Sequence, residues 1–135
     1  MNADEFVAAV RCHVAPALET YGFQLRTSVS GRMYDAEFDS PGLIVSISYE
    51  PGDDFFLVVV FQLVDGRRSD IDDRDATPRL SDLNRRFLTP ADASVLAERR
   101  SRNAAGDSQQ RRIQQIGADL AIVVPRYMAT LGLLQ

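Results

Sequence analysis

Side chains that act as nucleophiles or bases are scarce, because the 135 residues include one cysteine, Cys12, and one histidine, His13. Neighbouring residues on a helix point about 100° apart, so these two do not form a nucleophile–base pair. A single histidine cannot complete a relay, and one cysteine excludes an internal disulfide and argues against a zinc site. No glycine-rich phosphate loop or serine elbow is present. We therefore expect no enzymatic activity, no metal and no other cofactor.

Carboxylates gather in residues 65–79, where the density of acids resembles a calcium loop. The pattern fails there because Arg74 stands where an oxygen ligand is needed and no glycine follows at the turn. A second set alternates along residues 33–39, and we interpret it as the polar face of a strand, because glycoside hydrolysis needs an enclosing cleft around paired acids. That second set is Asp35, Glu37 and Asp39.

Every one of the 15 basic residues is arginine, so mechanisms that need a lysine are excluded. The charge is uneven, since residues 1–96 hold 16 acids and 9 arginines, and residues 97–135 hold 3 acids and 6 arginines. An overall isoelectric point near 4.9 argues against a general nucleic-acid binder.

Two charged clusters are candidate contacts for a protein partner. The basic cluster suits an acidic partner, because arginine pairs with carboxylates in a two-pronged geometry. Its members are Arg99, Arg100, Arg102, Arg111 and Arg112. The acidic cluster lies in the exposed loop and consists of Asp70, Asp72, Asp73 and Asp75.

Helical periodicity over residues 3–20 predicts an N-terminal helix. Asn2 and Glu5 have the spacing of a capping box, and Gly22 suits the position just after the helix. Pro16 removes one backbone hydrogen bond, so we expect a kink near Cys12.

Period-2 alternation predicts four strands, over residues 23–30, 33–39, 43–50 and 55–64. A two-residue turn at Ser30-Gly31 places Val29 opposite Arg32. A hairpin centred on residues 40–41 pairs Phe38 with Leu43. These registers keep the apolar residues of three strands on one face.

The fourth strand is apolar on both faces, interrupted by Gln62. Its residues Leu57, Val59, Phe61 and Leu63 can join the common face through a five-residue loop or a bulge. The surplus apolar surface, together with an unpaired strand edge, invites another chain. We therefore expect a homodimer, and the alternative is that the C-terminal helix covers the second face of a monomer.

The remaining residues predict a loop and helices. Residues 65–79 read as a long exposed loop with freedom to move. A short helix is expected over 80–88, and another from Thr89-Pro90 to about Asn103, stopping near Gly106. The last helix begins at residue 107 or 108, and Pro125 should kink or split it around Ala121.

These elements define one α+β domain over residues 1–135: an N-terminal helix, a four-stranded antiparallel meander, then two or three C-terminal helices packed on the sheet. No apolar run is long enough to cross a membrane, and the acidic start MNADEF is not a signal peptide. We expect a cytoplasmic protein without membrane contact.

The lead from helix to strand through Phe6, Pro16, Leu18, Gly22 and Phe23 looks like the layout of small bacterial proteins, some of which are immunity proteins against toxins. It also resembles secretion chaperones, whose helix between strands three and four is missing here. The resemblance and the absent catalytic groups predict a non-enzymatic protein-interaction module, immunity-type or chaperone-like. The alternative is a small-molecule-binding protein or enzyme with a pocket between sheet and helices.

Overall fold

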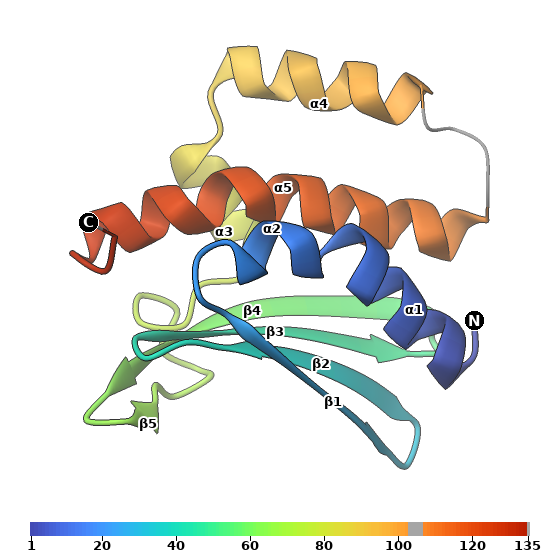
Figure 1. Cartoon of the computed structure of the whole chain (residues 1–135), viewed down its shortest axis with the longest axis horizontal. Helices are drawn as coiled ribbons and strands as arrows, with labels where there is room; N and C mark the ends of the chain where they lie inside the picture. The colour runs from blue at the N-terminus through green and yellow to red at the C-terminus, as the bar shows by residue number, and fades with distance from the viewer. Residues whose placement is uncertain (103–106, 135) are drawn as a thin grey trace.

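Helices flank one face of a curled antiparallel sheet in the computed structural model, which describes residues 1–102 and 107–134 (Figure 1). The predicted α+β class is confirmed, with a two-residue fifth strand as an addition. The strands run in the order β1-β2-β3-β4-β5 across the sheet. The elements are α1 (Ala3–His13), α2 (Ala15–Glu19), β1 (Gln24–Ser30), β2 (Met33–Asp39), β3 (Leu43–Glu50), β4 (Phe55–Val64), β5 (Arg67–Arg68), α3 (Leu80–Phe87), α4 (Pro90–Arg102) and α5 (Ser108–Thr130).

The N-terminal helix begins as predicted and breaks once. The Asn2 side chain accepts a hydrogen bond from the Glu5 amide at 2.8 Å, and the Glu5 carboxylate accepts one from the Asn2 amide at 3.3 Å. The break falls at Val14, two residues before Pro16. Pro16 has no amide to donate, and its ring crowds the carbonyl four residues earlier, so the chain starts a new helix there.

The meander is confirmed, but both predicted registers are displaced by two residues. Gly31 and Arg32 form the first turn, so Val29 lies opposite Tyr34 instead of Arg32. Gly31 has a φ of 59°, which the first position of a type II′ turn needs and glycine supplies without strain. In the second hairpin Phe38 pairs with Val45 instead of the predicted Leu43. A shift of two residues leaves every side chain on its predicted face.

The predicted face of β4 was wrong. Residues 51–54 form a four-residue loop between the paired residues Glu50 and Phe55. The loop closes through Asp54, whose φ is 49°. The observed loop is one residue shorter than the expected five-residue loop, and a shift of one residue reverses the two faces of a strand. The even-numbered residues Phe56, Val58 and Val60 therefore face the helices, and the odd-numbered ones face away.

The main core lies between the sheet and the helices. Side chains of α1, α2, three strands and α5 meet there with almost no exposure, among them Phe6, Val10, Leu18, Phe38, Ile47, Tyr49, Ile113, Leu120, Val123 and Tyr127. This burial fixes α1 and α5 side by side on the sheet.

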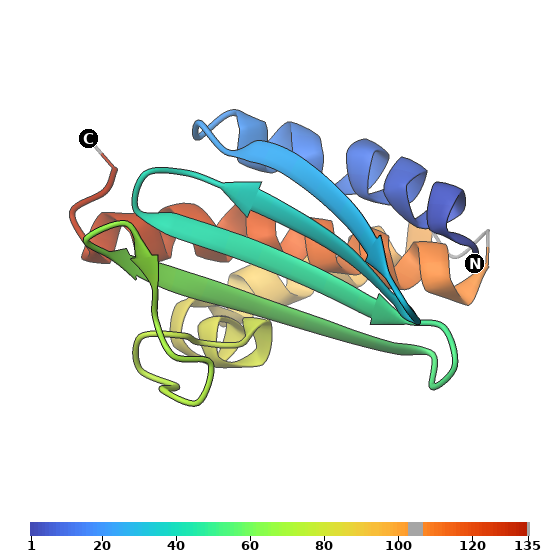
Figure 2. The ribbon, with the colours of Figure 1, turned by 90° about the horizontal axis from the view of Figure 1, so that it is seen from below.

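The opposite face of the sheet carries a smaller apolar cluster of Ile44, Val59 and Phe61. The segment after β4 flanks and covers it, as seen from below in Figure 2. The Val60 amide donates to the Pro78 carbonyl at 2.9 Å, which pairs the outer edge of β4. The Arg68 guanidinium lies 5.4 Å from the centre of the Phe61 ring. The surplus apolar surface of β4 is therefore partly covered from within the chain.

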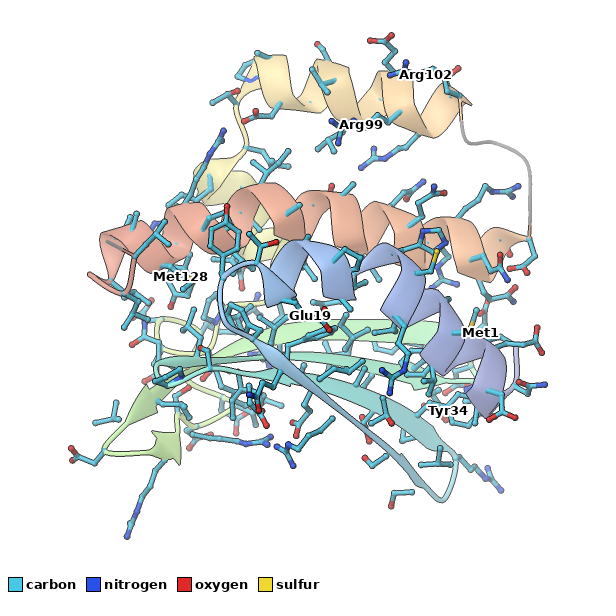
Figure 3. All side chains as sticks on the ribbon, viewed as in Figure 1. Met1, Glu19, Tyr34, Arg99, Arg102 and Met128 are labelled. Atoms are coloured by element: carbon cyan, nitrogen blue, oxygen red, sulfur yellow. The ribbon has the colours of Figure 1, made fainter. Side chains whose placement is uncertain are left out.

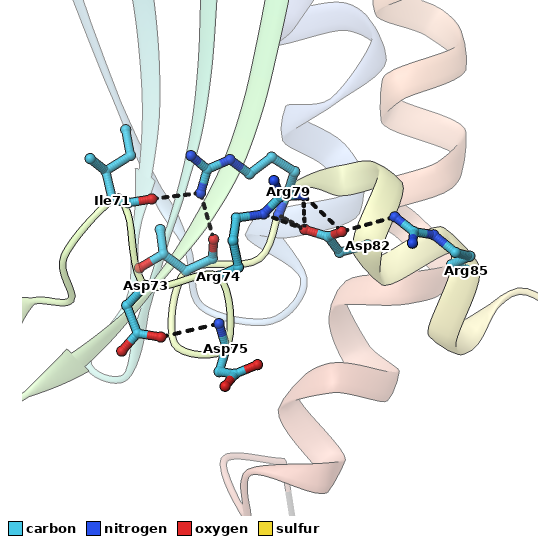
Figure 4. Close-up of polar contacts among 8 residues, drawn as sticks. Ile71, Asp73, Arg74, Asp75, Arg79, Asp82 and Arg85 are labelled. Atoms are coloured by element: carbon cyan, nitrogen blue, oxygen red, sulfur yellow. Dashed lines mark hydrogen bonds and ion pairs between the residues drawn. The ribbon is translucent and has the colours of Figure 1, made fainter.

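The loop over residues 65–79 is exposed for most of its length and carries many internal hydrogen bonds (Figure 4). Thr77 is fully buried and donates to the Asp70 carbonyl at 2.7 Å. The Asp73 carboxylate accepts from the amide of Asp75. Arg79 donates to the carbonyls of Ile71 and Thr77 at 2.7 and 2.9 Å. These bonds hold the loop together and join it to the start of α3, and the Gln62 backbone amide ties it to β4 by donating to the Ala76 carbonyl at 3.0 Å.

The C-terminal helices begin where the sequence predicts. Thr89 caps α4, and Asp107 caps α5. The predicted end of α4 at Asn103 to Gly106 lies outside the described residues. Of the two outcomes predicted for Pro125, a kink or a split, the split does not occur, because α5 runs through Pro125. Burial of the apolar face of α5 on the sheet outweighs the loss of one backbone hydrogen bond. Across the described residues, no helix combines the length and apolar character needed to cross a bilayer.

Candidate functional site

A groove of about 300 Å³ lies between α4 and the helices α1, α2 and α5. Helix α4 lies on the far side of α5 from the sheet, so this groove is part of an outer layer (Figure 1). It is lined by Cys12, His13, Pro16, Ala17, Leu96, Arg99, Arg100, Arg111, Gln114, Gln115, Gly117, Ala118 and Ala121. We call it the α4 groove.

Small residues on α5 and α2 create the space. The floor includes Ala17, Gly117, Ala118 and Ala121, whose side chains are too short to reach α4. A Cβ atom on Gly117 would lie 2.0 Å from the carbonyl oxygen of His13. The backbones of α5 and α1 therefore touch at this point, and the floor of the groove is fixed by the helix crossing.

The N-terminal end of α4 is held against α5 by hydrogen bonds from Arg126. The Arg126 guanidinium donates to the Phe87 carbonyl at 2.7 Å and to the Asp92 carboxylate at 2.6 Å. Arg126 and the Thr89 cap together hold the pKa of Asp92 far below its usual range. Further along α4, Leu96 is buried with 3% exposure. These contacts keep α4 above the groove at a set height.

Three of the five predicted arginines meet in the α4 groove. Arg99 points from α4 toward α5 (Figure 3), and it makes no hydrogen bond or ion pair with any described residue. Arg100 lies 3.7 Å from the Asp119 carboxylate, which is an ion pair beyond hydrogen-bond distance. Arg111 joins them from α5. The groove thus combines an apolar floor with guanidinium groups.

The other two arginines lie elsewhere. Arg102 points away from the groove (Figure 3) and pairs with Glu98 at 3.8 Å. Arg112 pairs with Asp54 at 3.1 Å and lies 4.6 Å from the centre of the Phe56 ring.

The predicted acidic cluster lies far from the predicted basic cluster of α4 and α5. Asp70, Asp72, Asp73 and Asp75 sit in the loop beside β4, at the opposite end of the molecule from the C-terminus of α4 (Figure 1). Carboxylates of Asp70 and Asp73 accept hydrogen bonds from the loop's own amides. Their first role is therefore to shape the loop.

The acidic side chains of β2 form ion pairs and hydrogen bonds with side chains of other strands, as expected for the polar face of a sheet. The Glu37 carboxylate is gripped by Arg68 through two hydrogen bonds of 2.6 and 2.7 Å and pairs with Arg26 at 3.1 Å. Asp39 pairs with Arg26, and Asp35 accepts from the Ser48 hydroxyl.

Sequence reasoning missed a buried polar pair formed by Asp119 of α5 and Asn84 of α3. Asp119 is 7% exposed, and its Oδ2 accepts a hydrogen bond from Asn84 Nδ2 at 3.1 Å. Burial raises the pKa of Asp119. The signal was available, because Asp119 falls at helical spacing between the apolar residues Ile116 and Val123.

Asn84 and Asp119 line a second cleft of about 450 Å³ between β4, α3 and α5. The cleft is lined by Phe55, Phe56, Leu57, Val58, Arg79, Leu80, Ser81, Asn84, Arg112, Gln115, Ile116 and Asp119. We call it the β4 cleft. A pocket between sheet and helices was the alternative that the sequence left open.

The chemistry available in the α4 groove is binding through guanidinium groups. Cys12 and His13 both line the groove, with Cys12 exposed. Among the described residues, no group of three or more histidine, cysteine or acidic side chains could hold a metal ion. No family model matches the chain, no curated protein is similar to it, and no solved structure matches its fold.

Proposed function

We propose that this protein is a non-enzymatic protein-interaction module that holds a short acidic segment of a partner protein in the α4 groove. The observation that carries the proposal is the Arg99 side chain, which points toward an apolar-floored groove with no partner in the described residues. A guanidinium on an apolar surface suits a carboxylate in a partner that also brings apolar side chains.

The shape of the groove favours a chain segment over a compact ligand. Its α5 wall extends from Arg111 to Ala121, and the ten steps between these residues correspond to about 15 Å of helix at 1.5 Å per residue. Its volume of about 300 Å³ is at the lower limit for drug-sized ligands. The small floor residues leave room for one or two apolar side chains, with the acids beside the arginines.

The wider proposal is an immunity-type or chaperone-like protein of the bacterial cytoplasm, supported by the layout and by the charge of the groove. A homodimer is part of the proposal too. It would draw on surfaces such as the exposed ring of Phe55, because Ala76, Pro78 and β5 already pair much of the outer edge of β4.

Selection of peptides from a random display library, followed by fluorescence anisotropy on the winners, tests the proposal. We expect winners that combine acidic and apolar residues. Arg99→Glu should weaken their binding by about tenfold or more, as loss and reversal of a charge-assisted contact imply.

The matched control is Arg102→Glu, the same substitution on the same helix but pointing away from the groove. It should leave the affinity within about twofold of the wild type. Equal losses of affinity in the two variants would mean that the peptides respond to the overall charge of the protein and not to the groove. Winners that lack acidic residues would contradict the proposed partner.

A further inference from the structure

We propose that the β4 cleft is a second binding site, which takes an organic cation: an apolar body carrying a primary ammonium group that donates to Asp119 and Asn84. This cleft adjoins the α4 groove, because Gln115 lines both and Arg100 of the groove lies 3.7 Å from Asp119, but the inference uses different binding groups and does not depend on the proposed function. It would give the protein a small-molecule ligand in addition to a protein partner.

Two buried acceptor atoms of the β4 cleft lack hydrogen-bond donors. Asn84 Oδ1 and Asp119 Oδ1 are both buried, and neither accepts a hydrogen bond. Buried polar atoms in folded proteins nearly always have a partner, and an acceptor without one lowers stability. Two neighbouring residues with this deficit, both lining one cleft, call for a group with several donors. A primary ammonium offers three.

The carboxylate of Asp119 favours a cation in the cleft. Asp119 is the one carboxylate among the lining residues, and its nearest cation, Arg100, stays 3.7 Å away. The two arginines that line the cleft are occupied by other groups. Arg79 donates to backbone carbonyls of its own loop, and Arg112 pairs with Asp54. An ionised Asp119 therefore has no hydrogen-bonded cation, and a ligand ammonium would supply one.

The cleft also has an apolar wall. Phe56, whose side chain faces the helices, is half-buried in the β4 side of the cleft. Leu80 and Ile116 complete the wall from α3 and α5. Such a wall binds an apolar ligand body, and the ring faces attract an ammonium group. A volume of about 450 Å³ is typical of a small-molecule site.

A matched pair of probes tests the site on the unaltered protein. 2-Phenylethylammonium and 2-phenylethanol have similar size and the same ring, but only the first carries a charge and three donors. Each is titrated into ¹⁵N-labelled protein while amide shifts are followed by NMR. We expect the ammonium probe to bind about tenfold or more tightly than the alcohol, with the largest shifts around Asn84, Ile116 and Asp119.

Variants locate the binding. Asp119→Asn should reduce the affinity for the ammonium probe by about tenfold and leave that for the alcohol unchanged. Asp75→Asn, which removes an exposed acid from the loop, should change neither. If Asp119→Asn does not fold, Leu80→Ala, at a partly buried position in the α3 wall of the cleft, should weaken both probes.

Three results would overturn the inference. Equal affinity for the two probes would make the cleft an apolar pocket with no cation preference. Absence of shifts at millimolar ammonium probe would mean that water alone serves the two acceptors. Shifts centred on the exposed loop acids instead of α3 and α5 would assign the cation to surface charge.

Discussion

Gly117 and the His13 carbonyl oxygen are so close that a Cβ atom on residue 117 would lie 2.0 Å from that oxygen. The contact joins α5 to the end of α1 and sets the floor of the α4 groove. A backbone atom cannot move aside as a flexible side chain would, so even one methyl group must push the helices apart.

Gly117→Ala should therefore destabilise the protein by about 3 kcal/mol or more, at the upper end of overpacking effects. Chemical denaturation measures the free energy of unfolding. The matched control is Gly52→Ala, where the nearest atom to an added Cβ is a side-chain oxygen at 3.8 Å. An equal and small effect in both variants would mean that the helices do not cross as described.

Gly31→Val tests the first hairpin turn. Gly31 has a φ of 59°, which a β-branched residue adopts poorly, so we expect a loss of about 1–3 kcal/mol. Arg32→Val, in the second position of the same turn, should have a much smaller effect, because Arg32 has no positive φ. Thermal melts of the two variants should separate clearly. A Gly31→Val melting temperature equal to that of the wild type would contradict the turn.

Arg68→Ala tests the cover on the outer face of the sheet. The Arg68 side chain lies on Phe61 and grips Glu37, so its removal should cost about 1 kcal/mol and expose the ring. Binding of an apolar dye should rise with it. Arg67→Ala, at the neighbouring exposed position, should leave stability and dye binding unchanged. Similar behaviour of the two variants would show that Arg68 covers nothing.

The ion pair of Asp92 should make the stability of the protein sensitive to acid. Arg126 and the Thr89 cap lower its pKa in the folded state. Its contribution to stability is therefore present above its unfolded pKa of about 4, and declines as the pH falls through the lower folded value. Asp92→Asn should be less stable than the wild type at pH 7, and the gap should narrow steadily below about pH 4.

Urea unfolding at a series of pH values measures this gap. Asp53→Asn is the control, since Asp53 is exposed and pairs with no arginine among the described residues. A gap that widens toward low pH would reverse the sign of the argument and remove Asp92 as the anchor of α4.

The sequence was sufficient for the parts of the fold governed by local rules. The cap at Asn2, the break before Pro16 and the alternation of the first three strands each depend on a few neighbouring residues. The face of β4 was not predictable in this way, because one residue more or less in the loop before Phe55 reverses it. Pro125 does not split α5, because burial of the rest of the helix offsets a local penalty.

The candidate site was predicted only in part. A cluster of arginines was evident in the sequence, but Arg99 and Arg102 lie three residues apart, and only the structure separates the one at the groove from the one turned away. The Asn84–Asp119 pair joins residues 35 positions apart, which no local pattern reveals. Gly117 stood in a helical pattern without a local reason, and its cause is a contact with a distant backbone.

The most direct test of the interaction proposal uses Cys12, the single cysteine of the chain, which is exposed and lines the α4 groove. The rate at which a maleimide reacts with its thiol is measured with a selected acidic peptide and with the same peptide carrying amides in place of its acids. At about ten times the dissociation constant roughly nine tenths of the grooves are filled, so the acidic peptide should slow the reaction about tenfold. The amide peptide should leave the rate unchanged. An unchanged rate with a peptide shown to be bound would place the partner elsewhere and contradict the proposal.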